Sequence, residues 1–155
     1  MSDFVFNIAK GRVAELFNRV KSNDPTNSAI IVVPVDRGAA SDATLKDTAT
    51  LTAALAVSGM TERTTGGWTR KTLTDADLSA IAVDDTNDRM PATIPAILWS
   101  PGPTTGAVTD LIFCYDPDTT GGTDANIVPL VMSAFAITPD GSDVQANAGD
   151  IYRAS

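Results

Sequence analysis

Two apolar runs separated by a polar, glycine-rich segment constrain the fold of this chain more than any other feature. The runs cover residues 109–116 and 127–137, and between them stands Pro-Asp-Thr-Thr-Gly-Gly-Thr-Asp-Ala-Asn. Apolar and β-branched residues on both sides of such a turn predict two strands joined by a loop. The strand pair is the densest apolar material in the chain, so we expect it at the centre of the core, with its aspartate loop as a candidate site.

The chain is long enough for one domain that folds without disulfides. It has 155 residues, and a chain of that size buries roughly 68–70% of its unfolded surface. Seventeen of its nineteen carboxylates are aspartates, beside nine prolines and eleven glycines. Asp, Pro and Gly favour turns and caps over helix interiors. We therefore predict short elements joined by structured turns, in one domain over residues 1–155 with no internal repeat.

Helical periodicity is clearest near the N-terminus. Residues 6–22 place Ala9, Val13, Leu16, Phe17 and Val20 on one apolar stripe, which predicts an amphipathic helix. A second short helix is expected over residues 44–57. It would turn three leucines inward, at Leu45, Leu51 and Leu55.

Other segments predict a third helix and a set of strands. Residues 74–81 begin with a capping Thr and acidic residues, as a short helix does. The β-branched run 29–35 predicts a strand that is either buried on both faces or at an edge because of Pro34. Strands are also expected at 64–73 and 92–99, with irregular loops at 84–88, 100–106 and 138–143 and a short terminal segment at 150–155. The predicted fold is α+β: a single β-rich domain, with the N-terminal helix and one or two short helices packed on a mainly antiparallel sheet.

The residue types present exclude the commonest catalytic groups. The chain has no histidine, so Ser-His, Cys-His and His-metal sites are ruled out. Its single cysteine, Cys114, lies in an apolar run, where a buried core residue is the favoured interpretation. Its glycine pairs do not have the spacing of nucleotide-binding loops. We therefore expect no enzymatic activity and no cofactor.

Charge and hydropathy restrict the partners. The net charge of −8 argues against nucleic-acid binding, which requires a surplus of Lys and Arg. The start of the chain lacks the features of a signal peptide, and no apolar run is long enough to span a membrane. We expect a soluble protein made in the cytoplasm. Residues 1–21 carry a local surplus of positive charge, from Lys10, Arg12, Arg19 and Lys21. These side chains form either a solvated helix face or a docking surface for an acidic partner protein, and the sequence leaves both interpretations open.

Two aspartate clusters are candidate sites. Asp116, Asp118 and Asp124 match positions one, three and nine of a calcium loop, but Ile127 stands at position twelve, where a bidentate Glu is required. A solvated hairpin loop is the favoured interpretation, and a weak calcium or magnesium site is the alternative. The second cluster, within residues 84–88, would need an apolar pocket to act as an acid–base pair, and its neighbours supply none.

Seven segments of the chain are similar to known proteins: residues 6–25, 73–78, 84–89, 114–116, 123–129, 137–144 and 153–155. Together they resemble a family of small structural proteins encoded among the head genes of tailed bacteriophages. The resemblance extends over nearly the whole chain and implies a virion component without enzymatic activity. The implied role is a minor capsid or decoration protein on the exterior of the major capsid shell, bound to the major capsid protein and to copies of itself.

Two other classes of function remain as alternatives to a capsid protein. They are a phage tail or head-to-tail connector component, and a β-rich module that binds calcium or carbohydrate. For a capsid-binding protein, Trp68 and Trp99 are candidate interface anchors, with core burial as the favoured interpretation of each. Phe4 and Phe6, ahead of the first predicted helix, are further docking candidates.

Overall fold

The two strands that flank the aspartate loop lie at the centre of the sheet in the computed structural model, which describes residues 3–154. β7 (Val108–Asp116) pairs on one edge with β8 (Val128–Ile137) and on the other with β2 (Ala29–Asp36). Both pairings are antiparallel. The predicted pair of strands is therefore confirmed.

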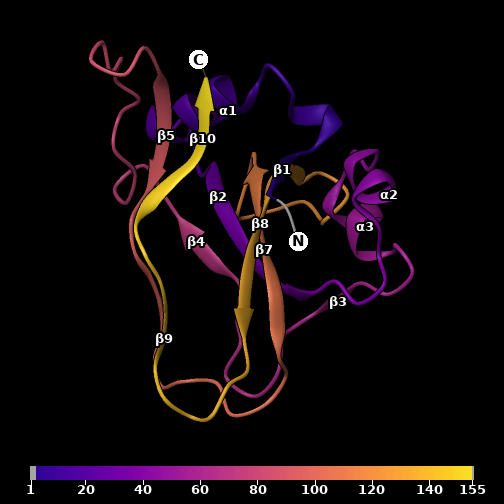
Figure 1. Cartoon of the computed structure of the whole chain (residues 1–155). Coiled ribbons are helices and arrows are strands. Elements are labelled where there is room, and N and C mark those ends of the chain that lie inside the picture. The colour runs from indigo at the N-terminus through magenta and orange to yellow at the C-terminus, as the bar shows by residue number, and fades with distance from the viewer. Residues whose placement is uncertain (1–2, 155) are drawn as a thin grey trace.

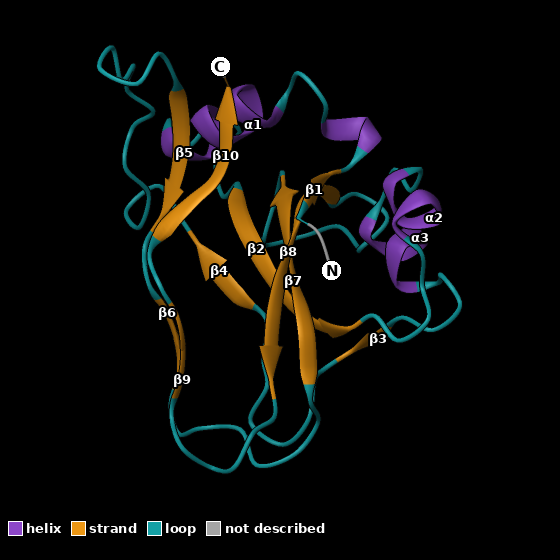
Figure 2. Ribbon diagram, in the orientation of Figure 1, coloured by secondary structure: helices purple, strands orange, loops and turns teal. Residues whose placement is uncertain are grey.

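Three short strands complete this sheet. β1 pairs with the outer edge of β8, while β3 and β4 pair with different parts of the outer edge of β2. The order is β1-β8-β7-β2-β3, with β4 beside β3 on β2, and all of these pairings are antiparallel (Figures 1 and 2). The bounds are β1, Phe4–Val5; β3, Thr61–Glu62; and β4, Lys71–Leu73.

A long two-stranded arm runs beside the sheet. β5 pairs with β10, and β6 pairs with β9. Because β5 and β6 follow each other in the chain, as do β9 and β10, the two pairs form one continuous ribbon (Figure 1). The arm comprises β5, Met90–Ile94; β6, Ile97–Trp99; β9, Val144–Ala146; and β10, Gly149–Ala154.

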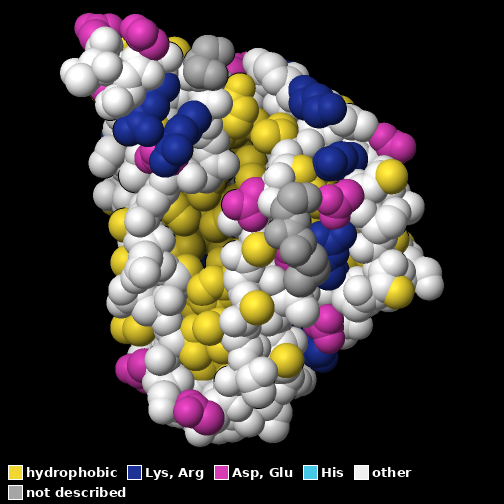
Figure 3. Space-filling view, viewed as in Figure 1, with side chains coloured by type: hydrophobic (Ala, Val, Ile, Leu, Met, Phe, Trp, Pro, Cys, Tyr) yellow, Lys and Arg dark blue, Asp and Glu magenta, His cyan; other side chains and the backbone are white. Residues whose placement is uncertain are grey.

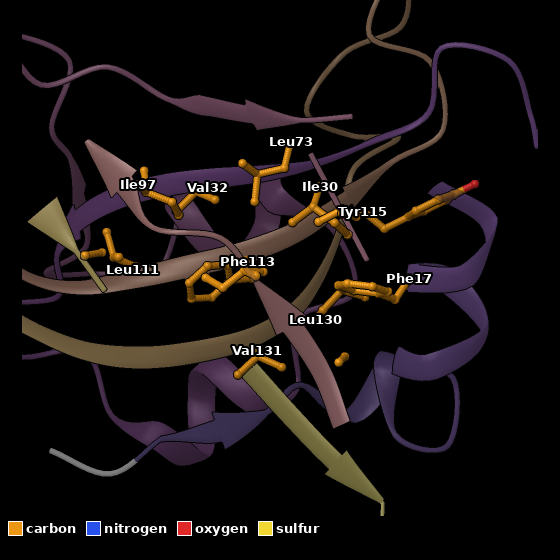
Figure 4. Close-up of a cluster of buried hydrophobic side chains, with 14 of the residues drawn as sticks. Phe17, Ile30, Val32, Leu73, Ile97, Leu111, Phe113, Tyr115, Leu130 and Val131 are labelled. Carbon is orange, nitrogen blue, oxygen red and sulfur yellow. The ribbon is translucent and has the colours of Figure 1, made fainter. Parts of the chain in front are cut away.

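Both faces of the sheet are covered. On β2, Ile30 and Val32 belong to one buried cluster, whereas Ile31 and Val33 belong to another on the opposite face. The first cluster includes residues of α1 (Val13–Lys21) and of the arm (Figure 4). The second includes residues of β1 and of two short helices, α2 (Asp42–Lys46) and α3 (Leu51–Leu55). The fold is therefore α+β with a mainly antiparallel sheet, as the sequence predicts.

The position of β2 explains how a proline fits in a central strand. β2 is buried from Ala29 to Val35, which decides between the two predicted alternatives. Pro34 lies between the residues that pair with β4 and those that pair with β3, and its carbonyl accepts a hydrogen bond from the Arg63 N–H. The N and C=O of one strand residue point to the same side, so the missing N–H falls at the gap between β4 and β3.

The N-terminal helix is shorter than the periodicity predicts. Residues Asn7–Ala9 form a 3₁₀ turn, and the α-helix begins only at Val13. Gly11 stands between them with φ +77°, a left-handed conformation that ends the first turn. Within α1 the predicted stripe is confirmed, because Val13, Leu16, Phe17 and Val20 are all buried.

The predicted helix over residues 44–57 is two helices. The side chain of Ser41 caps α2 by accepting from the Thr44 N–H, and Thr50 caps α3 by accepting from the Ala53 N–H. Hydroxyl side chains compete with helical hydrogen bonds, so Thr50 starts a new helix instead of continuing the first. Leu45 and Leu51 are buried as expected, and Leu55 is partly buried.

Three further predictions are wrong in extent. Only Lys71–Leu73 of the segment 64–73 is a strand, because Gly66 and Gly67 both have positive φ. Residues 74–81 form a turn and no helix, since the Asp77 carboxylate accepts the Thr74 N–H and closes the segment on itself. The segment 92–99 divides into β5 and β6, which pair with different strands. No helix among the described residues is long and apolar enough to cross a membrane.

Candidate functional site

The aspartate loop between β7 and β8 is held by hydrogen bonds within the protein. Asp116 accepts from the Asp118 N–H, and Asp118 accepts from the backbone and hydroxyl of Thr120. These bonds lower the pKa of Asp118, with the Thr120 hydroxyl as the main cause. This is the pattern of a hairpin loop in which aspartates cap backbone N–H groups.

Asp124 is held by a different partner, Arg70. The guanidinium makes two hydrogen bonds of 2.7 Å to the Asp124 carboxylate and two more, of 2.6 and 2.7 Å, to Glu62. The bonds to Asp124, followed by those to Glu62, raise the pKa of Arg70, and the same contact lowers the pKa of Asp124. Arg70, the residue that precedes β4, thus joins the loop to β3.

The three aspartates do not come together as a cation site. Within residues 3–154, no group of three His, Cys, Asp or Glu side chains is arranged to hold a metal ion. Asp124 is occupied by Arg70, and Asp118 turns back to Thr120. The loop therefore has a structural role in this fold.

The second aspartate cluster closes a turn. Asp84 accepts hydrogen bonds from Asn87 and from the Arg89 Nε, and the backbones of Asp84 and Arg89 form an isolated bridge. The bonds from Asn87, and next those from Arg89, lower the pKa of Asp84. An acid–base pair needs one carboxyl with a raised pKa, and the pKa of Asp84 moves in the opposite direction.

The basic residues near the N-terminus are partly paired. Arg12 and Arg19 both contact Glu15, with Nε–O distances of 3.3 and 3.2 Å. Lys21 donates to the backbone carbonyl of Asp75. Lys10 is exposed at the turn before α1. Contacts of this kind are typical of a solvated helix face. They also leave the face accessible to a partner protein.

The aromatic docking candidates are core residues. Phe6 has no exposed surface, and Phe4 packs edge-on against it in the cluster beneath α2 and α3. Trp68 and Trp99 are each 1% exposed and also pack edge to face. Their indole N–H groups donate to the carbonyls of Gly106 and Thr69 respectively. A docking role for these four side chains is wrong, and the core interpretation of the tryptophans is confirmed.

A buried ion pair lies on the same side of the sheet as α2. Arg37 Nη1 and Asp110 Oδ1 are 3.8 Å apart, and both side chains are almost fully buried. Neither Asp110 oxygen has a hydrogen-bond partner among the described residues. Burial raises the pKa of Asp110, although the charge of Arg37 opposes this. Cys114 belongs to the buried cluster on this face of the sheet, and burial raises the pKa of its thiol. It is therefore a core residue, as predicted.

An apolar groove between the sheet and the arm is the feature that the sequence reasoning missed. It has a volume of about 310 Å³ and is visible as a hollow lined by hydrophobic side chains (Figure 3). Leu111, Phe113 and Val131 belong to its lining on the sheet side, and Ala146 and Ile151 belong to it on the arm side. Alternating apolar residues in the two walls were visible in the sequence, but nothing indicated that they face each other across a gap.

Two strand edges border the groove. β8 pairs with β1 only at Val131 and Met132, so no described strand pairs with the outer edge of residues 133–137. On the other side, β9 pairs only with β6 and β10 only with β5 among the described strands. We call residues 133–137 of β8 and residues 144–151 of the arm the open edges.

Each open edge contains a β-bulge. On β8, Phe135 and Ala136 together stand opposite the single residue Thr109. On β10, Ile151 is the additional residue between Asp150 and Tyr152. Bulges redirect side chains, and both Phe135 and Ile151 line the groove.

Comparison with protein-family models, with curated proteins and with solved structures found no match to this chain. The fold and the groove define the class: an α+β protein with a mainly antiparallel sheet and an apolar groove beside it.

Proposed function

We propose that this chain is a non-enzymatic structural protein of a tailed-bacteriophage virion. In this role it is a decoration or minor capsid protein on the capsid exterior, where it binds and stabilises the major capsid shell. Its partners are the major capsid protein and further copies of itself. The resemblance of segments along nearly the whole chain supports this class of protein.

The observation that carries the proposal is the apolar groove between the sheet and the arm. A hollow with an apolar floor and a few polar groups around it is typical of a binding site for another molecule. Gln145, Asn147 and Asp150 stand among the polar residues that line it. A contact surface of this kind is what a capsid-binding protein requires.

Ion pairs that join distant segments also support a structural role. Besides Arg70, Arg63 binds Asp36 of β2 at 2.5 Å and donates to the Ala107 carbonyl. Arg89 contacts Asp84 and lies 4.0 Å from Asp150 of β10. Each arginine connects a loop or edge to a different part of the chain. Loops held in this way present one fixed surface, as binding to a repeating lattice requires.

The proposal is tested by binding to particles. Virions that contain this protein are stripped of it, and purified protein is added back at increasing concentration. We expect saturable co-sedimentation, regular density on the outside of the shell in a particle reconstruction, and greater resistance of the shell to heat. Protein that stays in the supernatant, or that appears only on the tail, would contradict the capsid role.

A further inference from the structure

The groove between the open edges has the features of a site for an extended polypeptide. Its floor is apolar, and its volume of about 310 Å³ is at the lower end of the range for ligand pockets, about 300–1,000 Å³. Both of its long sides are strand edges, where backbone N–H and C=O groups await partners. An aliphatic ligand fills apolar space but leaves such groups without hydrogen bonds, whereas a peptide backbone satisfies them.

We propose that the groove accepts an extended strand of a partner subunit. The strand pairs with residues 133–137 of β8 or with the arm edge. Successive side chains of a strand point to opposite faces, so every second residue of the partner faces the floor formed by Leu111, Phe113 and Val131. These floor-facing residues are apolar, and the residues between them face solvent.

The charge of the groove indicates which partner fits. Asp3 and Asp150 are its charged lining residues, and no Lys or Arg of the described chain lines it. Asp150 is already bound to Thr93 and Arg153. Asp3 is exposed, and its Oδ1 accepts the Ala134 N–H of the open edge at 2.7 Å. A partner strand with a Lys or Arg opposite Asp3 is therefore complementary.

The same charge argues against a second copy of this chain as the occupant. A segment of a second copy comes from a chain with a net charge of −8, and like charges oppose its insertion beside Asp3. This argument concerns the groove alone and leaves contacts between copies elsewhere on their surfaces unaffected. The occupant is an extended segment of a different subunit, with apolar residues at alternate positions and a basic residue near one end. This inference rests on the proposed function only for the source of that segment.

The bulges support a binding role for the edges. A bulge turns Phe135 and Ile151 toward the groove from opposite sides. Bulges and charged side chains also protect edges from indiscriminate pairing. The contact from Asp3 blocks one N–H of β8, so pairing is restricted to a strand that replaces or extends this contact.

The test selects peptides on the purified full-length chain from a displayed library of random dodecapeptides. We expect enriched peptides to alternate apolar and polar residues and to carry a Lys or Arg. In isotope-labelled protein, these peptides should shift and slow the exchange of amides within residues 133–137 or 144–151. Failure to enrich any peptide, or protection of amides elsewhere, would overturn the proposal.

Variants show whether the groove itself is responsible. Ser133→Phe fills the groove from β8, and Asp3→Lys reverses its free charge; each should weaken peptide binding at least tenfold. Leu98→Phe is the matched control, because Leu98 is 48% exposed and outside the lining. It should bind as the wild type does. Circular dichroism checks that each variant is folded. If Asp3→Lys does not fold, the conservative variant Asp3→Asn replaces it in the binding measurement. Equal binding by all folded variants would contradict the proposal.

Three further outcomes separate this inference from its alternatives. Laurate is added as an aliphatic probe, and saturable laurate binding in the groove without slowed amide exchange would overturn a polypeptide occupant. Capsid occupancy that Ser133→Phe and Asp3→Lys leave unchanged would contradict the groove and keep the proposed function. Peptide binding at the groove by a protein that does not bind capsids would keep the groove and contradict the proposed function.

Discussion

Arg70 and Asp124, which are 54 positions apart in the sequence, form a bidentate ion pair in which both N–O distances are 2.7 Å. The same guanidinium binds both oxygens of Glu62. One side chain thus joins the long loop between β7 and β8 to the short strands at the edge of β2. The loop that most resembled a metal site in the sequence is organised by an arginine.

Replacing Arg70 with Met should destabilise the protein. The substitution leaves Glu62 and Asp124 close together without a cation, and hydrogen bonds to charged groups contribute about 1.5–3 kcal/mol each when well shielded. Because all three side chains are partly exposed, we expect a loss of about 1–3 kcal/mol in total by urea denaturation. Arg12→Met, at an exposed pair, is the control and should change stability by less than about 0.5 kcal/mol. Equal losses in both variants would contradict this role.

Acid should weaken the contact between Arg70 and Asp124. The folded-state pKa of Asp124 is lowered from 3.8, so its contribution is present above that pH and is lost as pH falls through the folded-state value. Asp124→Asn removes this proton linkage. We expect the variant to be less stable than the wild type at pH 7, with a difference that shrinks as pH falls below 3.8. Urea denaturation across this range provides the measurement, and a constant difference would argue against the linkage.

Asp110 should show the opposite pH dependence. Burial raises its folded-state pKa above 3.8, so the unfolded state loses the proton first and the wild type is destabilised as pH rises through this window. Asp110→Asn keeps the shape without the charge. Its stability relative to the wild type should therefore increase from pH 3.5 upward and level off above the raised pKa. A relative stability that decreases with pH would show that the ion pair with Arg37 outweighs desolvation.

Phe6 should be necessary for folding, not for docking. It has no exposed surface, and truncation of a buried Phe to Ala typically costs about 3–5 kcal/mol. We expect a loss of that size for Phe6→Ala in thermal or urea denaturation. Ile8→Ala is the control two residues away, because Ile8 is 38% exposed, and it should stay within about 0.5 kcal/mol of the wild type. Deletion of residues 1–8 should likewise destabilise the isolated fold, contrary to what a purely docking segment predicts.

Gly102 should not tolerate a side chain. A Cβ at this position would lie 1.8 Å from the Ser142 carbonyl oxygen, so the loop 100–106 would have to move away from residues 138–143. We expect Gly102→Ala to cost more than about 2 kcal/mol, the range of strained core substitutions. A Cβ at Gly149 would meet nothing within 4 Å, so Gly149→Ala should be neutral or stabilising by about 0.4–1 kcal/mol. Differential scanning calorimetry of the two variants distinguishes these outcomes.

Local patterns in the sequence determined the elements at the centre of the fold. Apolar residues on both sides of a polar turn predicted β7 and β8, and a β-branched run predicted β2. The stripe from Val13 to Val20 predicted α1, and an apolar neighbourhood predicted the burial of Cys114. Such patterns are readable because burial repeats at the period of the local backbone.

Where a single residue changed the backbone, the periodicity failed. Gly11 shortened the N-terminal helix, Thr50 divided the second one, and the Asp77 carboxylate closed a turn where a helix was expected. In each case a local conformation or hydrogen bond replaced the helical one. The apolar pattern alone carries no signal of this competition.

Only the tertiary structure decided the long-range relationships. The pairing of Arg70 with Asp124, the burial of Phe6, and the gap between residues 133–137 and the arm all depend on segments that are distant in the chain. An ion pair or an open edge depends on which elements pack together, and residue type alone does not specify its partner. The sequence by itself therefore determined the apolar strands and the α1 stripe, while the packing of the arm beside the sheet created the groove.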